Sequence, residues 1–290
     1  MEYGQLFAFV VFADRLNFTH AARELHISQP ALHVQIKKLT EAVGRPLYRR
    51  AGRALTLTAE GRRLAAYGRE VEQRGRQVLA EVRGETAAAP VVLASGQGAF
   101  LYLLGGAIRR FLRQRGALRL ATLPGPDAIE AVRDARAHLA VVAADAPPPD
   151  LDATRLREVG QVVVLPAAHR LARRRSLRPA DLDGEAIVVA PAGTPHRAML
   201  AQLLRAARAD WTVAVEAAGW ELMLHFARLG LGIAVVNDFC PVPPGMTAIT
   251  LTGAPAITYH LLSRSGPRPP SIDALHALIR ESVRAATMVR

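Results

Sequence analysis

Apolar residues in the first 57 positions recur at spacings of three and four, the period of short amphipathic helices. The first predicted helix carries an apolar face of Leu6, Phe9, Val10, Ala13 and Leu16. A second helix is expected to begin at Thr19, a residue type that caps helix N-termini, and to bury Ala22 and Leu25. This part of the chain therefore predicts a small helical head.

A tight turn leads into a third predicted helix whose two faces differ sharply. Ser28 can cap this helix, and Pro30 is tolerated in its first turn because an N–H group there would be unbonded anyway. Gly44 suits its C-terminus. The buried face is predicted to hold Leu32, Ile36, Leu39 and Val43. The opposite face then presents Gln29, Pro30, His33, Val34 and Lys37.

A proline-free segment from Thr58 to Gly84 predicts one helix of about 26 residues, about 40 Å long. Its apolar positions form only a thin seam of Leu64, Val71, Val78 and Val82. Three glycines seven residues apart lie in the same segment, Gly61, Gly68 and Gly75. Each weakens an isolated helix, so the repeat indicates either a close helix contact or chance in a glycine-rich chain. Residues 87–90 are predicted to form a hinge.

Beyond the hinge, strand-like and helix-like segments alternate. The strand-like runs cover 91–95, 118–123, 139–143, 162–165, 186–190, 211–215, 233–236 and 258–263. The helix-like runs cover 101–115, 128–136, 197–209, 221–229 and 272–286. This alternation predicts open, mostly parallel sheets with a ligand crevice beyond the carboxyl ends of the strands. Periodicity alone does not decide between one large sheet and two small lobes.

Charge and cysteine usage narrow the class of protein only a little. The formal net charge of +12 favours a polyanionic partner, but 35 of the 37 basic residues are arginine and they are spread along the chain. Cys240 is the only cysteine and is better explained as a small buried hydrophobe than as a reactive thiol. No apolar segment approaches the roughly 20 residues of a membrane span. We expect a cytoplasmic protein with no membrane partner.

The third helix and the segment after it predict an interface for DNA. Glutamine can bond adenine through two hydrogen bonds, and lysine serves guanine or phosphate, so Gln29 and Lys37 suit a helix in the major groove. Residues 47–57 resemble a short hairpin that carries Arg49, Arg50 and Arg53, which would hold phosphates or a narrow minor groove. Ordinary solvated side chains remain the alternative explanation for any one of these residues.

Taken together, these segments resemble the DNA-binding signature of the LysR family of transcriptional regulators. The resemblance rests on residues 17–22, 28–32, 35–39, 47–50 and 57–61, and it continues at 169–172 and 229–234 in the second half. It implies an α/β architecture with an N-terminal winged helix-turn-helix, a long linker helix, and a two-lobed effector domain similar to periplasmic solute-binding proteins. The implied units are 1–57, 58–86 and 87–290, with lobe I at about 90–162 and 265–290 and lobe II at about 163–264.

The family pattern implies a set of DNA-contacting residues. These are Thr19, Ser28, Gln29, Pro30, Ala31, His33, Gln35, Lys37, Arg50 and Arg53. Two positions depart from the usual pattern. His33 stands where the family usually has serine, which changes a phosphate or base contact and adds sensitivity to pH near neutrality. Thr40 stands where glutamate is usual and removes an acid that normally pairs within the domain.

The resemblance also implies an effector site between the lobes. Its residues would be Ser95, Gln97, Gly98, Pro124, Thr194, Pro195, His196 and Trp220. Several of them precede predicted helices, and N–H groups at a helix N-terminus attract carboxylates or phosphates, so an anionic small-molecule effector is expected. For Gly96 and Gly98, the alternative is a simple tight turn.

Catalytic signatures are missing from the sequence. A dinucleotide fingerprint would need glycine where Leu101 stands, and no nucleophile elbow or zinc motif occurs. We therefore expect no enzyme activity, cofactor or metal. The predicted function is a sequence-specific transcriptional regulator whose binding to double-stranded promoter DNA is modulated by the effector. It would act as a homodimer or homotetramer, with RNA polymerase as a further partner. The alternatives are a solute-binding protein and an α/β enzyme with a DNA-binding head.

Overall fold

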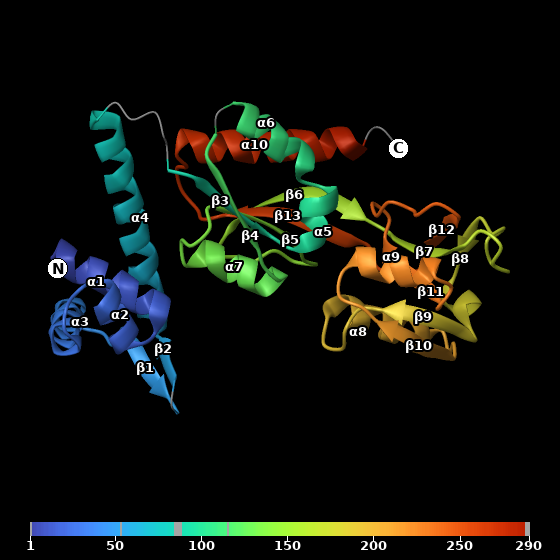
Figure 1. Ribbon diagram of the computed structural model, residues 1–290, viewed down its shortest axis with the longest axis horizontal. Coiled ribbons are helices and arrows are strands. Elements are labelled where there is room, and N and C mark those ends of the chain that lie inside the picture. Colours follow the sequence, from blue (N-terminus) through green and yellow to red (C-terminus); the bar gives the residue numbers. More distant parts are fainter. Residues whose placement is uncertain (1, 53, 84–88, 115, 288–290) are drawn as a thin grey trace.

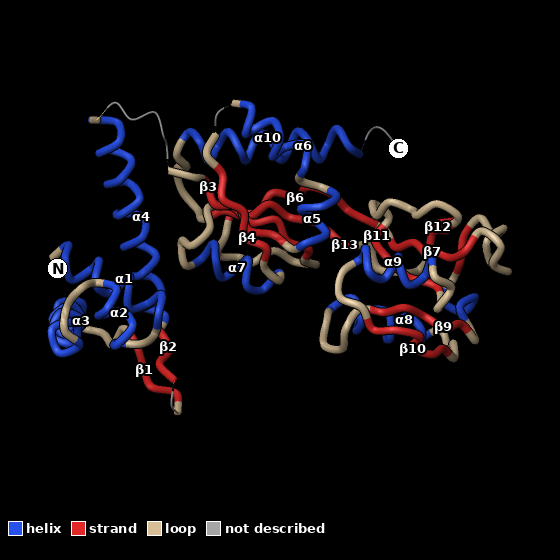
Figure 2. Tube along the Cα trace, viewed as in Figure 1, coloured by secondary structure: helices blue, strands red, loops and turns tan. Residues whose placement is uncertain are grey.

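The computed structural model describes residues 2–52, 54–83, 89–114 and 116–287. Figure 1 shows three parts in chain order: a helical head that carries a hairpin, one long helix, and two α/β lobes side by side. Figure 2 shows that the strands fall into three groups, the hairpin and one sheet in each lobe. The two-lobed alternative is therefore the correct one for the second half of the chain.

The head is built from α1 (Tyr3–Arg15), α2 (Phe18–Glu24), α3 (Gln29–Val43) and the antiparallel hairpin of β1 (Tyr48–Ala51) and β2 (Ala54–Leu57). Its core side chains are fully buried and include Phe9, Phe12, Leu32, Ile36, Leu39 and Leu47. As predicted, Ser28 caps α3, and Gly44 ends it with a φ of 71°.

Two details of the predicted head are wrong. The side chain of Asn17, and not that of Thr19, caps α2 by accepting a hydrogen bond from the N–H of His20. A β-region backbone at Asn17 starts the helix two residues earlier, so Thr19 lies inside its first turn. Val43, which was expected on the buried face of α3, is 36% exposed.

The long helix α4 (Ala59–Val82) begins after Thr58, whose hydroxyl accepts from the N–H of Gly61 at 3.0 Å. The glycine repeat is partly explained by packing. A Cβ atom at Gly61 would lie 1.8 Å from the carbonyl oxygen of Leu47, and one at Gly68 would lie 2.5 Å from Val10. At Gly75 a Cβ atom would meet nothing within 4 Å. The first two glycines therefore allow α4 to lie close against the head, whereas the third has no packing role of this kind.

Lobe I surrounds a five-stranded sheet in the order β4-β3-β5-β13-β6. Its strands are β3 (Val91–Ser95), β4 (Leu118–Thr122), β5 (Leu139–Ala143), β6 (Asp152–Val159) and β13 (Ile257–Ser263). Its helices are α5 (Gln97–Tyr102), α6 (Gly105–Arg113), α7 (Gly125–Arg133) and α10 (Pro270–Thr287). Alternate strand residues face opposite layers: Leu93 packs toward α6 and α10, and its neighbour Ala94 packs toward α7.

Lobe II surrounds a six-stranded sheet in the order β10-β9-β11-β7-β12-β8. Its strands are β7 (Gln161–Pro166), β8 (Ser176–Leu177), β9 (Glu185–Val189), β10 (Trp211–Glu216), β11 (Ile233–Asn237) and β12 (Met246–Leu251). A 3-10 turn covers Pro179–Leu182, and the helices are α8 (Pro195–Ala206) and α9 (Trp220–Arg228). Val188 faces the layer of α9, and Ile187 faces that of α8.

The structure corrects three expectations about the lobes. Both sheets are mixed, because β13 is antiparallel to β5 and β6, and β7 is antiparallel to β11 and β12. The segment 257–263 belongs to the sheet of lobe I, so the boundary at 264 is wrong: a strand's sequence does not reveal which sheet it joins. The predicted helix 101–115 is interrupted at Leu103 and Leu104. In addition, the sequence did not predict the strands β6, β8 and β12.

Substitution of the α4 glycines by alanine should separate close packing from helix propensity. Gly61→Ala is expected to destabilise the head by about 2–4 kcal/mol, because a backbone carbonyl must move. Gly75→Ala should stabilise α4 by about 1 kcal/mol, because no neighbour is displaced. Urea-dependent hydrogen exchange of amides in α1 to α3 measures the first effect without mixing in unfolding of the lobes. Equal effects at both positions would contradict the packing explanation.

Candidate nucleic-acid interface and effector site

The start of α3 presents a polar, exposed surface. Gln29, Pro30, His33 and Lys37 are exposed, and Ala31 and Gln35 are half-buried. Ser28 is exposed as well, but its hydroxyl accepts from the N–H of Ala31 at 3.3 Å and so caps the helix. The Thr19 hydroxyl donates to Oε1 of Gln29 at 3.2 Å. This contact orients the Gln29 amide while leaving its two N–H groups and one oxygen lone pair for another partner.

His33 is held by an aromatic contact that the sequence did not predict. Its ring stacks on Phe18 with centroids 3.7 Å apart and planes 13° apart. Phe18 is buried at the start of α2, so the stack joins α2 to α3 while the imidazole edge stays exposed. Thr40, the other unusual position, donates its hydroxyl to the carbonyl oxygen of Ile36 at 2.8 Å. The side chain at this position therefore bonds within its own helix.

The hairpin adds arginines beside α3. Arg49 and Arg50 are exposed, and Nε of Arg50 donates to the carbonyl oxygen of Gly52 at 3.2 Å. A groove of about 640 Å³ runs between the two elements, and its lining includes His33, Lys37, Arg49 and Arg50. Arg49 lines this candidate surface although it is absent from the family-derived set, and the hairpin pattern was the signal that pointed to it. Arg53 lies outside the described residues.

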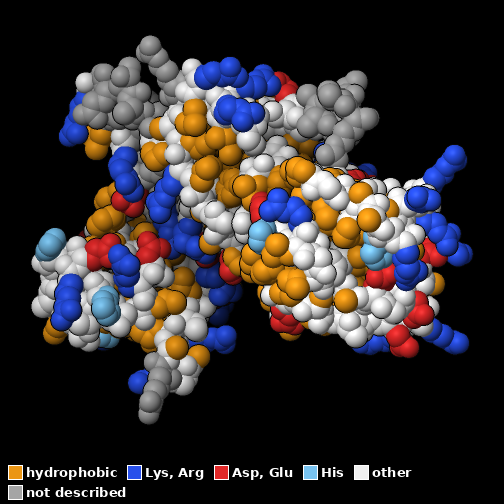
Figure 3. Space-filling model, turned by 45° about the vertical axis from the view of Figure 1, so that its right-hand side comes forward, with side chains coloured by type: hydrophobic (Ala, Val, Ile, Leu, Met, Phe, Trp, Pro, Cys, Tyr) orange, Lys and Arg blue, Asp and Glu red, His pale blue; other side chains and the backbone are white. Residues whose placement is uncertain are grey.

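Basic side chains are not confined to the head. In the view of Figure 3, Lys and Arg side chains lie over the head and over both lobes. Many of them form ion pairs, such as Arg133 with Asp150 at 2.7 Å and Arg110 with Glu281 at 3.0 Å. The net charge of +12 therefore does not locate the interface, and the candidate surface is the one that α3 forms with the hairpin.

On the lobe I side of the effector site, the loop after β3 lies beside the loop after β4. A Cβ atom at Gly96 would lie 3.9 Å from the carbonyl oxygen of Leu123. Pro124 is exposed at the start of α7. Ser95 is placed differently from our expectation: its side chain is fully buried, and its hydroxyl donates to the carbonyl oxygen of Val141 at 2.7 Å. The hydroxyl of Ser95, at the end of β3, is therefore bonded to the neighbouring strand β5.

The two lobes touch through these same loops. A Cβ atom at Gly98 would lie 2.8 Å from Nε1 of Trp220, and one at Gly219 would lie 3.2 Å from Oε1 of Gln97. The Tyr102 hydroxyl donates to Oε1 of Glu221 at 2.6 Å, which joins α5 to α9. The structure thus brings Gln97, Gly98 and Trp220 together as predicted. Tyr102 and Glu221 were missed, because 119 residues separate them in the chain.

On the lobe II side, the start of α8 holds His196 against Trp220. The Thr194 hydroxyl accepts from the N–H of Arg197 and donates to the carbonyl oxygen of Pro191, so it serves as the cap before Pro195. The rings of His196 and Trp220 meet edge to face, with centroids 4.7 Å apart. Both ring nitrogens of His196 are buried without a hydrogen-bond partner among the described residues. Burial lowers the pKa of His196 to about 4, so the ring is neutral at pH 7.

The described parts of the chain hold neither a cluster of metal ligands nor a membrane-spanning helix. There, no group of three or more His, Cys, Asp or Glu side chains is placed to hold a metal ion. The helices of the same residues include none that is both long and apolar enough to cross a membrane. Cys240 is buried.

Comparison with known families decides the class of protein. Residues 3–62 match the family described as bacterial regulatory helix-turn-helix protein, lysR family, and residues 84–284 match the LysR substrate binding domain. This chain belongs to the LysR family of transcriptional regulators. It therefore combines a DNA-binding helix-turn-helix with an effector-binding domain, as the sequence predicted.

Individual LysR-family proteins resemble the chain over its full length. The Hca operon transcriptional activator HcaR of Escherichia coli (strain K12) is 27% identical over 304 residues, covering 99% of this chain and 100% of HcaR. Full-length OxyR from Pseudomonas aeruginosa has a TM-score of 0.69 at 22% identity, covering 98% of this chain and 95% of OxyR. Full-length CbnR in complex with its target DNA has a TM-score of 0.58 at 18% identity, covering 97% of this chain and 100% of CbnR.

Acidification should destabilise this LysR-family protein through His196. Its folded-state pKa of about 4 lies below the ordinary value of 6.5, so the unfolded chain binds more protons between these pH values. Stability is therefore intact above pH 6.5 and falls as the pH drops toward 4, by at most about 1.4 kcal/mol per pH unit. Urea unfolding of lobe II gives its free energy of unfolding at each pH from 7 to 5. This free energy should fall less steeply with decreasing pH in His196→Gln than in the unchanged chain. The same substitution at exposed His26 serves as the control and should leave the slope unchanged.

Proposed function

We propose that α3 reads base edges in the major groove while Arg49 and Arg50 hold the flanking phosphates. The Thr19–Gln29 hydrogen bond carries this proposal, because a pre-oriented amide suits two-point recognition of adenine. His33 would stand beside Gln29 as a ring locked on Phe18, so it offers an edge of fixed direction. Ser28, Pro30 and Ala31 would bring the helix start close to the backbone, and Gln35 and Lys37 would extend the contact. CbnR, a structural neighbour, has been solved with its target DNA.

The second part of the proposal concerns assembly. The last turns of α4 expose apolar side chains: Val78 is 40% exposed, Leu79 54% and Val82 79%. Such a seam on a helix of 24 residues suits pairing with the same helix of a second copy. Two paired heads would read an interrupted inverted repeat, and two dimers would form a tetramer on the promoter. A regulator of this kind works beside the chromosome, so we place it in the cytoplasm.

The third part concerns the effector, which we place between the lobes. Gln97, Gly98, His196 and Trp220 supply donors and an aromatic wall there, with Pro124 and Pro195 at the edges. N–H groups at the start of α8 favour a small anion. By binding one arrangement of the lobes more tightly, the effector would shift how the heads meet DNA. HcaR is by name an activator, which supports RNA polymerase as a further partner.

Substitutions in the head should separate base reading from phosphate binding. Gln29→Ala is expected to reduce discrimination between promoter and unrelated DNA about tenfold, because one two-point base contact is lost. Arg50→Ala should weaken binding to both DNAs equally. It should also reduce the slope of log affinity against log salt concentration by about the amount that one phosphate contact contributes. Gel shifts at several salt concentrations, on the DNA upstream of the gene, give both quantities. Absence of salt-sensitive, sequence-specific binding in the unchanged chain would refute the regulator's assigned interface.

Charge placed on the exposed seam of α4 should disrupt assembly. Leu79→Asp is expected to shift the protein toward monomer at micromolar concentration, because burying an unpaired carboxylate opposes helix pairing. Analytical ultracentrifugation measures the change. Leu112→Asp is a matched control on α6, where a leucine of similar exposure, 51%, lies away from the seam. An unchanged mass for Leu79→Asp would exclude this face as the dimer contact.

A further inference from the structure

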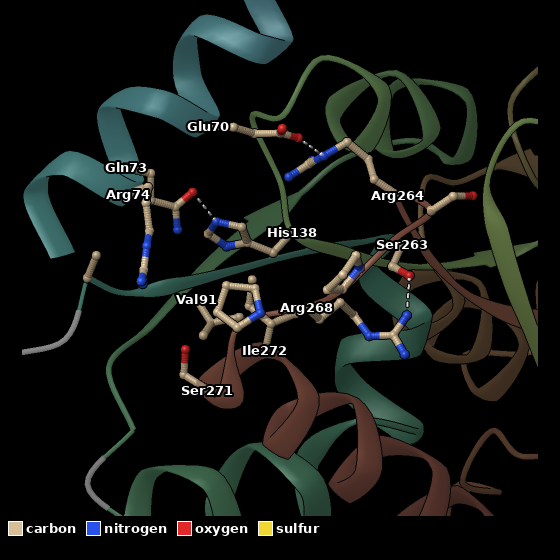
Figure 4. A pocket seen from close by; sticks show the side chains of 14 residues that line it. Glu70, Gln73, Arg74, Val91, His138, Ser263, Arg264, Arg268, Ser271 and Ile272 are labelled. Atoms are coloured by element: carbon tan, nitrogen blue, oxygen red, sulfur yellow. Dashed lines mark hydrogen bonds and ion pairs between the residues drawn. The ribbon is translucent and has the colours of Figure 1, made fainter. Parts of the chain in front are cut away.

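A cavity of about 360 Å³ lies between α4 and lobe I, away from the effector site between the lobes. Figure 4 shows its walls: α4 contributes Gln73 and Arg74, the start of α10 contributes Ser271 and Ile272, and Val91 comes from β3. The volume lies within the range of small-molecule sites. Because its walls belong to both the linker helix and the sensing domain, any occupant would contact both.

The cavity owes its shape to polar contacts that hold α4 on lobe I. Nε2 of His138 lies 2.8 Å from Oε1 of Gln73, and Nδ1 accepts from the N–H of Val92 at 2.7 Å. Burial lowers the pKa of His138 to about 4, so the neutral ring donates through Nε2. Arg264 donates to Glu70 at 2.6 Å and to the carbonyl oxygen of Val132. These contacts form within the chain, so the walls exist without a ligand.

Several of the remaining polar side chains in the walls can donate hydrogen bonds. Arg74 is exposed and forms no ion pair with any residue that the structure describes. Figure 4 shows its side chain extending from α4 toward the side of the cavity where Ser271 lies, in the first turn of α10. Among the lining residues the only acid is Glu70, and Arg264 already pairs with it. Arg268 is likewise paired, with Asp273 at 2.8 Å. Within the part of the chain that the structure describes, Arg74 therefore contributes a positive charge that no ion pair offsets.

The rest of the lining is apolar. Val91 is 2% exposed and Ile272 6% exposed, and Pro267 and Pro269 complete this surface. An apolar floor below an unpaired guanidinium fits a ligand with a hydrocarbon body and one carboxylate. We propose that this cavity binds a small organic carboxylate, with the carboxylate on Arg74 and Ser271 and the body on Val91 and Ile272. Such a ligand would fasten α4 to the start of α10, and so couple linker and lobe I independently of the effector.

Isothermal titration calorimetry on the full chain, without DNA, tests this site. The probes are hexanoate, hexanol as the uncharged analogue, and inorganic phosphate, all at one ionic strength. We expect saturable hexanoate binding that Arg74→Ala weakens about tenfold, through loss of a charge-assisted contact. Arg76→Ala is the matched control, since this neighbouring arginine of α4 pairs with Glu72 and does not line the cavity. Trp220→Ala, at the effector site, should leave hexanoate binding unchanged.

Three results would overturn the proposal. The first is that hexanoate shows no saturable binding up to about 10 mM. A dissociation constant above that concentration would be weaker than the roughly millimolar affinity expected for such a site. The second is binding that Trp220→Ala abolishes and Arg74→Ala spares, which would place the ligand between the lobes. The third is equal binding of hexanol, or Arg74-dependent binding of phosphate alone, because either would contradict an organic carboxylate. None of these results bears on the assigned DNA interface, so the two proposals fail separately.

Discussion

The architecture depends on one helix that must fit two partners at once. Near its start, α4 approaches the head so closely that Gly61 and Gly68 leave no room for a side chain. Further along, it contacts lobe I through Gln73 and Arg69. Arg69 also donates to Asp14 of α1 at 2.5 Å, so one guanidinium touches the head and the sensing domain. Because both contacts lie on a single helix, a displacement of lobe I that moves α4 would also move the head.

The proposed DNA interface is shaped by contacts between elements more than by charge. Leu32, Ile36 and Leu39 fix the inner face of α3, and the outer face is then ordered by its neighbours on α2. Thr19 orients Gln29, and Phe18 orients His33. A recognition surface whose side chains are already placed loses less conformational entropy when it binds. The unusual histidine is therefore part of the packing between α2 and α3 as well as part of the exposed surface.

Several contacts join the two lobes of the sensing domain. Tyr102 and Glu221 form one hydrogen bond, and Trp220 packs against the backbone of Gly98. His196 lies against Trp220, and no described residue forms a hydrogen bond with either of its two buried ring nitrogens. Buried polar groups without partners are costly, and a ligand that supplies a donor and an acceptor there would gain that free energy. The arrangement suits a domain whose lobes change their contacts when an effector binds.

The sequence by itself determined the local structure and the family. Helix period, the caps at Ser28 and Thr58, and Gly44 depend on residues close in the chain, and most predicted strands match the structure to within a residue or two. Only the tertiary structure decided which sheet each strand joins, since β13 pairs with β5, more than a hundred residues away in the chain. It also decided that Ser95 supports a sheet, that His33 stacks on Phe18, and that Tyr102 meets Glu221. These contacts join residues distant in the chain, and periodicity carries no record of such pairings.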